Sequence, residues 1–325
     1  MTRLLRIALA SLLALLLAGA AFAQAAPACP PIAQAPTPAQ LQEGIRHARD
    51  HGFLWRISKG GRSSWLYGTL HAARFEWTFA GPSLLAALQA SDTIALEIDA
   101  LDPAIQRRMA LALAGQPRPA LPPALQQRLE RAAQAGCVPL QALDGLAPEM
   151  QIATLTTLLG RRGGLDPSHS IDLVLSRWGR EAKRRVVSLE SPELQLAALQ
   201  SASPAETIES VTSALDELEA GRTLPLLLRM ARVWADGDWA ALSAYEGWCD
   251  CRKTAADRAG LARLLDDRNP ALADGIAALH ASGRRVFAAV GSLHMIGPAG
   301  LPALLVQRGY RVERITIDPL RETRP

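Results

Sequence analysis

The stretch Leu66-Tyr67-Gly68-Thr69-Leu70-His71 recurs near the other end of the chain as Ala289-Val290-Gly291-Ser292-Leu293-His294. Each copy reads as an apolar strand followed by a glycine, a small hydroxyl residue, a leucine and a histidine. The context repeats too, because a short helix and then a strand are predicted after each copy, at 82–88 and 93–98 and at 300–307 and 310–317. Polar residues just past the carboxyl ends of strands line the ligand crevice of open α/β sheets. We therefore expect both histidines to face one site.

Composition sets the class of protein. The chain has 325 residues, of which 49% are apolar and 20% charged, and this suits one large globular domain or two interlocked halves. The formal net charge is +4, and two of the positive charges, Arg3 and Arg6, lie in a segment that we expect to be removed. Such a small excess of positive charge argues against a surface that binds nucleic acid or an acidic membrane.

The first 23 residues have the pattern of a secretory signal. Arg3 and Arg6 precede an apolar run at 7–17, and Ala21-Phe22-Ala23 is a small-x-small cleavage site. The alternative is an uncleaved membrane anchor, but the apolar run is shorter than the ~20 residues that a spanning helix needs. We predict cleavage after Ala23, no membrane span in the mature chain, and a periplasmic or secreted location.

The rest of the chain is predicted to contain an Ala/Pro-rich leader at 24–40 and a single α/β domain at 41–325. The segment Lys59-Gly60-Gly61-Arg62 indicates a β-hairpin turn between strands at 53–57 and 64–67. The second of these strands leads directly to His71. Further strands are predicted at 185–189 and 286–290. The long middle carries apolar residues at helical spacing, with helices expected at 103–114, 122–134, 148–159, 170–180, 204–220, 224–235, 240–245, 255–265 and 270–281.

Four cysteines, Cys29, Cys137, Cys249 and Cys251, fit an oxidising compartment. The C-x-C pair suggests half of a thiolate metal site, but no further Cys or His stands at a recognisable spacing. Two structural disulfides are the favoured interpretation. A bond between two cysteines so close in the chain is expected to be strained, so Cys249 and Cys251 are predicted to pair with Cys29 and Cys137.

Two carboxylates follow predicted strands. In Ile94-Ala95-Leu96-Glu97-Ile98-Asp99 the alternation places Glu97 near the carboxyl end of a strand, on the face opposite the isoleucines. A buried carboxylate needs compensation, so Glu97 lies at a wet rim, in an ion pair, or beside a cation such as a metal. Glu190 also follows a predicted strand, and the same three alternatives apply to its carboxylate. It directly precedes the predicted helix start at Ser191-Pro192, however, where the helix dipole stabilises an acid regardless of function.

His71, His294 and Glu97 together make a ligand set of two imidazoles and one carboxylate. Three protein ligands leave a position for water, and a divalent cation lowers the pKa of that water, as in metal-dependent hydrolases. No H-E-x-x-H, G-x-S-x-G, phosphate-binding glycine loop or G-x-G-x-x-G motif is present. The alternative is a pair of structural histidines that cap the two strands.

Several segments carry a resemblance to a known family. They are Gly68-Thr69-Leu70-His71, Leu96-Glu97-Ile98-Asp99, Ser188-Leu189-Glu190-Ser191 with Gln195, Asp267-Arg268-Asn269, and Val290-Gly291-Ser292-Leu293-His294-Met295-Ile296-Gly297 with Gly309-Tyr310. In this order, and from about Trp55 to Ile317, the chain resembles the TraB/GumN family. That family is similar to the Tiki metalloproteases and, more distantly, to erythromycin esterases and the haem-binding ChaN proteins.

The resemblance implies an α/β fold whose two pseudo-symmetric strand–GxxH–helix–strand halves form a mixed central sheet with a helix-rich middle insertion. It also implies a metal-dependent hydrolytic centre at His71, Glu97 and His294. Other positions shared with the family are Glu190, Gln195, Arg268 and Asn269. Arg268 is expected to clamp a substrate carboxylate, to stabilise developing negative charge, or to pair with Glu190. The sequence departs from the family at Ala72-Ala73-Arg74, where a valine or isoleucine and a proline often stand.

The leading hypothesis is an exported, peptidase-like hydrolase in which metal-activated water attacks an amide or ester carbonyl of a peptide or small-molecule substrate. The catalytic candidates are Glu97, Glu190 and Arg268, with Glu190 or an unassigned acid moving protons. The ligand set suits zinc, manganese or cobalt, and the resemblance favours manganese or cobalt. One alternative is a haem- or ligand-binding protein with Tyr67 and Met295 as axial groups. Another is an envelope interaction scaffold with the same fold.

Overall fold

The computed structural model describes residues 28–316. The predicted signal at 1–23 and its cleavage site lie outside these residues. From Ile32 onward the described chain belongs to one compact unit. Its first helix, α2 (Pro38–Arg46), begins with a capping box in which Thr37 and Gln40 satisfy each other's backbone N–H groups, so helical structure starts inside the predicted leader.

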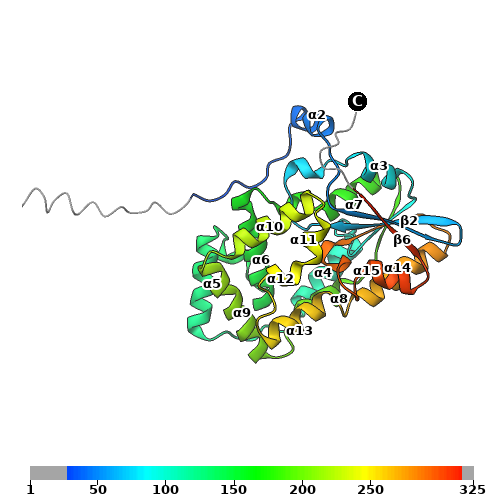
Figure 1. Ribbon diagram of the computed structural model, residues 1–325. Coiled ribbons are helices and arrows are strands. Elements are labelled where there is room, and N and C mark those ends of the chain that lie inside the picture. Colours follow the sequence, from blue (N-terminus) through cyan, green and yellow to red (C-terminus); the bar gives the residue numbers. More distant parts are fainter. Residues whose placement is uncertain (1–27, 317–325) are drawn as a thin grey trace, which may run out of the picture. The chain divides into compact units, whose positions relative to one another are not determined.

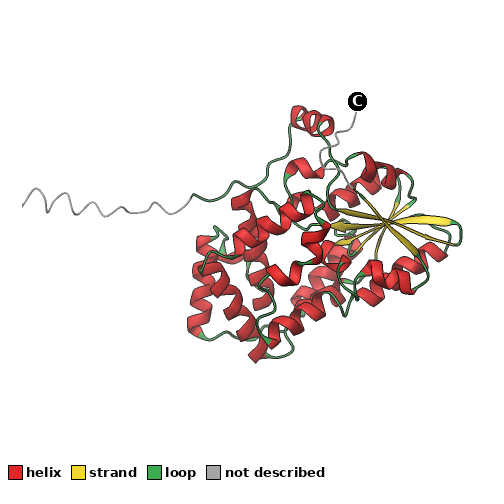
Figure 2. Cartoon of the chain, viewed as in Figure 1, coloured by secondary structure: helices red, strands yellow, loops and turns green. Residues whose placement is uncertain are grey.

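The unit contains a six-stranded mixed sheet in the order β4-β3-β5-β2-β1-β6. Figure 2 shows the strands in yellow, with helices packed around them. Its strands are β1 (Phe53–Lys59), β2 (Arg62–Thr69), β3 (Thr93–Leu96), β4 (Arg185–Ser188), β5 (Val286–Gly291) and β6 (Arg311–Ile315). β1 runs antiparallel to its neighbours β2 and β6, whereas β2, β5, β3 and β4 pair in parallel. The expected α/β class with a mixed sheet is confirmed.

The two repeated units interleave in the sheet. The first unit contributes β2 and β3, and the second contributes β5 and β6. β5 lies between β2 and β3 in the sheet, and β2 in turn lies between β5 and β1, which pairs with β6. β2 and β5 are therefore direct parallel neighbours, with Thr69 opposite Gly291. Because parallel strands end at the same edge, the turns that follow them, which carry His71 and His294, lie next to each other.

Helices cover both faces of the sheet (Figure 1). α3 (Pro82–Gln89) and α7 (Ile171–Glu181) lie on one side, and α14 (Asn269–Ala281) and α15 (Leu301–Gln307) on the other. Every residue of β3 and β5 is buried, as expected for parallel strands sandwiched between helices. Gly179 of α7 allows a close approach, because a Cβ there would lie 2.7 Å from Val186 of β4.

The remaining helices form the middle insertion, a group beside the sheet in Figure 1. They are α4 (Pro103–Ala114), α5 (Pro123–Ala135), α6 (Pro148–Leu159), α8 (Pro192–Leu199), α9 (Pro204–Glu219), α10 (Thr223–Ala235), α11 (Trp239–Ser243), α12 (Tyr245–Trp248) and α13 (Ala255–Leu264). Leu129, Leu155 and Leu215 join α5, α6 and α9 in a second apolar core. Between residues 28 and 316, no helix has the length and apolar character that crossing a bilayer requires.

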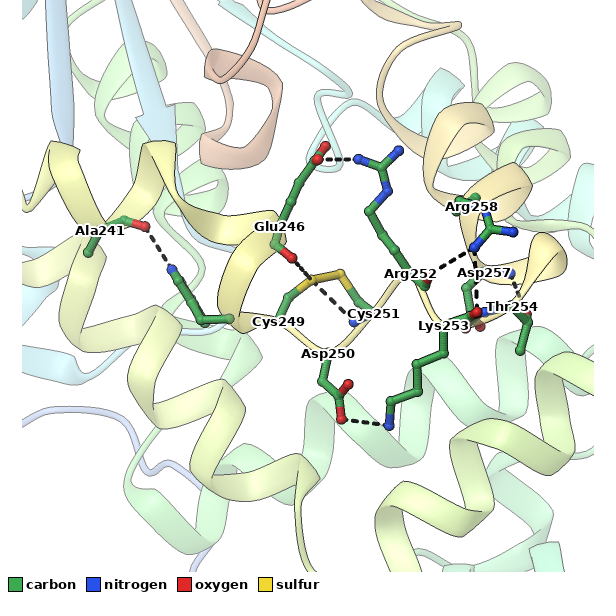
Figure 3. The surroundings of a disulfide bond; sticks show 11 residues. Ala241, Glu246, Cys249, Asp250, Cys251, Arg252, Lys253, Thr254, Asp257 and Arg258 are labelled. Atoms are coloured by element: carbon green, nitrogen blue, oxygen red, sulfur yellow. Dashed lines mark hydrogen bonds and ion pairs between the residues drawn. A yellow bond between two sulfur atoms is a disulfide. The ribbon is translucent and has the colours of Figure 1, made fainter.

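The cysteine pairing differs from the prediction. Cys249 and Cys251 are bonded to each other, on the loop between α12 and α13 (Figure 3). Asp250 between them adopts a left-handed φ of 54°, which folds the chain back and brings the two Cα atoms to 5.0 Å, inside the usual range for a disulfide. Aspartate tolerates this conformation better than most residues, and its carboxylate is held by Lys253. Cys29 and Cys137 are disulfide-bonded as well.

This oxidation state predicts a definite mass. Because none of the four cysteines is free, protein purified without reductant should weigh four hydrogens less than the fully reduced chain. Mass spectrometry under non-reducing conditions measures this difference, and a partial proteolytic digest should yield Cys249 and Cys251 in one internally bonded peptide. A mass equal to that of the reduced chain, or a peptide linking Cys249 to Cys137, would contradict the expected pairing.

Candidate functional site

Four side chains gather where the parallel strands end. His71 follows β2, Glu97 is the first residue after β3, Glu190 follows β4, and His294 lies in the 3-10 turn Ser292–Met295 after β5. The sheet order brings these residues to one edge although they come from distant parts of the sequence. Strand order, rather than any local motif, assembles the site.

Gly291 forms the floor between three of these side chains. A Cβ built on Gly291 would lie 3.2 Å from Glu97 Oε1, 3.5 Å from His71 Nε2 and 3.6 Å from His294 Cδ2. The three groups thus converge on a space that exists because residue 291 has no side chain. The other motif glycine, Gly68, has a different role, because a Cβ there would lie 2.8 Å from Ser292 Oγ and would push the two turns apart.

His294 is buried, and Asn269 at the start of α14 sets its tautomer. The Asn269 amide donates to the carbonyl of Ala299 at 2.8 Å, so its oxygen accepts from His294 Nδ1–H at 2.6 Å. Proton placement at Nδ1 leaves the lone pair of His294 on Nε2, facing the other site residues. Burial disfavours the charged ring and lowers the pKa of His294 to about 4.

His71 is more open, with 64% of its side chain exposed, and its orientation is set by Asp172 in the first turn of α7. His71 Nδ1–H donates to Asp172 Oδ2 at 2.9 Å, while Thr69 Oγ donates to the other oxygen at 2.9 Å. The charge of Asp172 raises the pKa of His71 to about 9. As in His294, Nδ1 of His71 is hydrogen-bonded to a neighbouring side chain, and Nε2 faces the site.

Glu97 is almost fully enclosed, with 4% of its side chain exposed. Its Oε1 accepts from the backbone N–H of Gly291 at 2.6 Å, and its Oε2 accepts from Arg268 at 2.6 Å and from Gln195 at 3.3 Å. Burial pushes the pKa of Glu97 upward, but His71, His294 and Arg268 outweigh it and lower the pKa to about 2. Glu97 is therefore an ionised carboxylate aimed at the histidines.

Arg268, at the N-cap of α14, links Glu97 to Glu190. Its Nε donates to Glu190 Oε1 at 2.9 Å, and its Nη2 donates to both Glu190 Oε2 and Glu97 Oε2. The pairing of Arg268 with Glu190 that the sequence left open is present, and it extends to Glu97. Both carboxylates of this triad are 4% exposed, and the guanidinium is 12% exposed.

The charges of this edge do not balance. Glu97 and Glu190 share the Arg268 guanidinium, and Asp172 pairs with His71, whose pKa of about 9 makes it cationic near neutral pH. Three carboxylates therefore meet two positive charges, which leaves one excess negative charge. Like charges in a low-dielectric environment repel strongly, and a bound cation relieves this repulsion. The electrostatics of the site favour a positively charged ligand.

The donor set fits a divalent metal ion. His71 Nε2, Glu97 Oε1 and the His294 ring lie around one space, and Nδ1 of each ring is hydrogen-bonded to an oxygen, as is usual for metal-binding histidines. Within residues 28–316, however, no cluster of three His, Cys, Asp or Glu side chains is already arranged as a metal site. The guanidinium of Arg268 instead contacts both Glu97 and His294.

The sequence model of the TraB/PrgY/gumN family matches residues 53–314, which include all the site residues named above. The chain belongs to this family. No curated protein and no solved structure matches the sequence significantly. The family assignment agrees with the resemblance drawn from the paired G-x-x-H turns.

In this TraB/PrgY/gumN protein, sequence reasoning missed one residue that orients the site. Asp172 follows a helix start at Ser170, where an acidic residue is expected from the helix dipole alone, and nothing local links it to His71, 101 positions earlier. The sequence indicates Asn269 and Gln195 only as positions shared with the family, whereas in the structure they contact His294 and Glu97. These contacts depend on the packing of α7, α8 and α14 against the sheet edge.

The two candidate haem ligands lie in the core instead. Tyr67 is 1% exposed and its hydroxyl donates to the carbonyl of His51 at 2.8 Å, while Met295 is 2% exposed. The Tyr67 side chain lies on the face of β2 that packs against Trp234 and Phe287. Neither side chain is available to a ligand at the edge of the sheet, and this arrangement does not favour haem.

Proposed function

We propose that this protein is a divalent-metal-dependent hydrolase that cleaves amide or ester bonds in a peptide or small-molecule substrate. The observation that carries the proposal is the convergence of His71 Nε2, Glu97 Oε1 and the His294 ring above Gly291. Two imidazoles and one carboxylate form a common ligand set of metallohydrolases, and the excess negative charge of the site supports a cation there.

His71, Glu97 and His294 would hold the metal ion. When bound, such an ion polarises a carbonyl group and makes water a nucleophile at neutral pH. Asp172 and Asn269 each bind Nδ1 of one histidine and thereby keep the Nε2 atoms of both rings directed inward. Because His71 is largely exposed, the site opens to solvent on its side, and substrate would enter there.

Arg268 and Glu190 are proposed to act together. Both oxygens of Glu190 accept from Arg268, so Glu190 is better placed to hold the guanidinium than to move a proton. Arg268 in turn brings positive charge to the edge where a carbonyl oxygen would become negative during attack. These contacts support a positioning role for Glu190, which we propose in place of the proton transfer suggested by the sequence.

We also propose that the protein is exported. Disulfides persist in oxidising compartments, and all four cysteines are bonded. The predicted signal at 1–23 supports the same conclusion. Expression with and without residues 1–23, followed by fractionation, tests this proposal, and equal retention of both forms in the cytoplasm would contradict it.

Metal content, spectrum and turnover together test the proposed function. Protein isolated without chelator should contain about one transition-metal ion per chain and no Soret band, and should cleave members of a peptide and ester library monitored by mass spectrometry. Treatment with EDTA should abolish cleavage, and manganese, cobalt or zinc should restore it. A Soret band would support the haem alternative, whereas neither metal nor turnover would support an interaction scaffold.

A further inference from the structure

All five N–H bonds of Arg268 are in use. Nε and Nη2 donate to the two oxygens of Glu190, and Nη1 donates to the Leu264 carbonyl at 2.8 Å. The other two donors reach the candidate ligands, from Nη2 to Glu97 Oε2 at 2.6 Å and from Nη1 to His294 Nε2 at 3.3 Å. Since arginine has five N–H donors, the guanidinium is saturated in this arrangement.

The bond to His294 is the decisive one. Asn269 takes the proton on Nδ1, so Nε2 has the one free lone pair of the ring, and Arg268 Nη1 donates to it. A lone pair cannot accept from a guanidinium and bind a metal ion at the same time. A metal ion at His294 must therefore displace at least this donor of Arg268.

Electrostatic repulsion also favours displacement of Arg268 by a metal ion. Arg268 is the cation that hydrogen-bonds to the buried carboxylates of both Glu97 and Glu190. A divalent cation beside Glu97 would repel the guanidinium, because both charges are positive and the surroundings are largely buried. Glu190 would keep the displaced guanidinium nearby, since it holds Nε and Nη2 through a two-point contact.

We propose that Arg268 competes with a metal ion for His294 Nε2 and yields this atom to an incoming cation, while Glu190 retains the guanidinium beside the site. This inference rests on the proposed metal-dependent function. The three bonds to Glu190 and Leu264 persist after displacement, and the N–H groups released from Glu97 and His294 become available to an oxygen atom of the substrate. Arg268 thus competes with the metal, and Glu190 sets how strongly it competes.

Two substitutions should therefore shift metal affinity in opposite directions. Arg268→Gln removes the competitor, and it should tighten Mn²⁺ binding about tenfold, equivalent to about 1.4 kcal/mol. Glu190→Gln leaves Arg268 with Glu97 as its one anionic partner, and it should weaken Mn²⁺ binding about tenfold. Isothermal titration of Mn²⁺, and separately of Zn²⁺, into chelator-stripped protein measures both dissociation constants without any assay of activity.

Stability gives a second measurement. In EDTA, Arg268→Gln should melt below wild type, because two buried carboxylates lose their cation, and saturating Mn²⁺ should raise its melting temperature more than that of wild type. If this variant does not fold, Arg268→Gln/Glu190→Gln removes one charge of each sign. This double variant should still bind Mn²⁺ more tightly than Glu190→Gln alone.

A matched control separates local competition from general electrostatics. Arg128 also bridges two acids, Asp216 and Glu219, but it does so between α5 and α9, and Arg128→Gln should leave Mn²⁺ affinity unchanged. Equal or weaker binding by Arg268→Gln, with wild-type protein binding normally, would overturn the displacement proposal. Absence of binding in wild type and every variant would instead refute the metal site, and this inference with it.

Discussion

His71→Ala and His294→Ala are each expected to abolish stoichiometric metal binding and hydrolysis, and the double variant is expected to be little worse than either single variant. The two side chains face one space above Gly291, so removal of either leaves an incomplete ligand set. Groups that act as a unit give strongly non-additive losses. Calorimetric titration of manganese, cobalt and zinc into stripped wild type and the three variants measures this.

The stability of these variants should differ. His71 is largely exposed and pairs with Asp172, so its loss should lower the melting temperature of metal-stripped protein less than the loss of His294 does. His294 is buried, and His294→Ala leaves Asn269 Oδ1 without its donor, which costs about 1–3 kcal/mol.

His280→Ala is the matched control for a buried histidine. His280 contacts Ser64 and the Lys59 carbonyl, away from the site, so this variant should lose stability and keep its metal. Wild-type metal affinity in His71→Ala or His294→Ala would exclude a shared centre and favour the binding-protein alternative.

Gly291→Ala should weaken metal binding at least ~100-fold, or about 2.7 kcal/mol, although it removes no ligand. The added methyl would occupy the space on which Glu97 Oε1, His71 Nε2 and the His294 ring converge. The backbone of Gly291, with φ of −48° and ψ of 138°, is accessible to alanine, so the fold should be retained. Circular dichroism and titration of the same preparation separate loss of fold from loss of metal.

Gly260→Ala provides the comparison. Gly260 lies on α13, where an added Cβ would meet Arg263 Nη2 at 3.8 Å, an ordinary van der Waals distance. This variant should bind metal like wild type and be slightly more stable, because alanine favours helix more than glycine does. Unchanged metal affinity in Gly291→Ala would show that the metal does not occupy the space above this glycine.

Local patterns predicted many elements closely. The helices at 103–114 and 148–159 were placed to the residue, since proline at the first position marks each helix start. β3 ends at Leu96, two residues before the predicted end, because Ser188 at the end of β4 takes the backbone N–H of Asp99 with its hydroxyl. Glu97 consequently stands at the sheet edge, where its side chain turns toward Gly291.

The disulfide error has a different origin. The short spacing of Cys249 and Cys251 predicted that a bond between them would be strained. The left-handed conformation of Asp250 removes that obstacle. Such a conformation is rare for a residue other than glycine, so composition and periodicity could not indicate it.

The sequence by itself determined the family, the α/β class and the repeated turns that present His71 and His294, because strand periodicity, proline and glycine act over a few residues. Only the tertiary structure decided what these residues contact. Asp172 orients His71 from 101 positions away, Asn269 orients His294, and Arg268 reaches Glu97 across 171 positions. These contacts follow from the insertion of β5 between β2 and β3 and from the docking of α7 and α14 at the sheet edge, and long-range strand order leaves no periodic trace in a sequence.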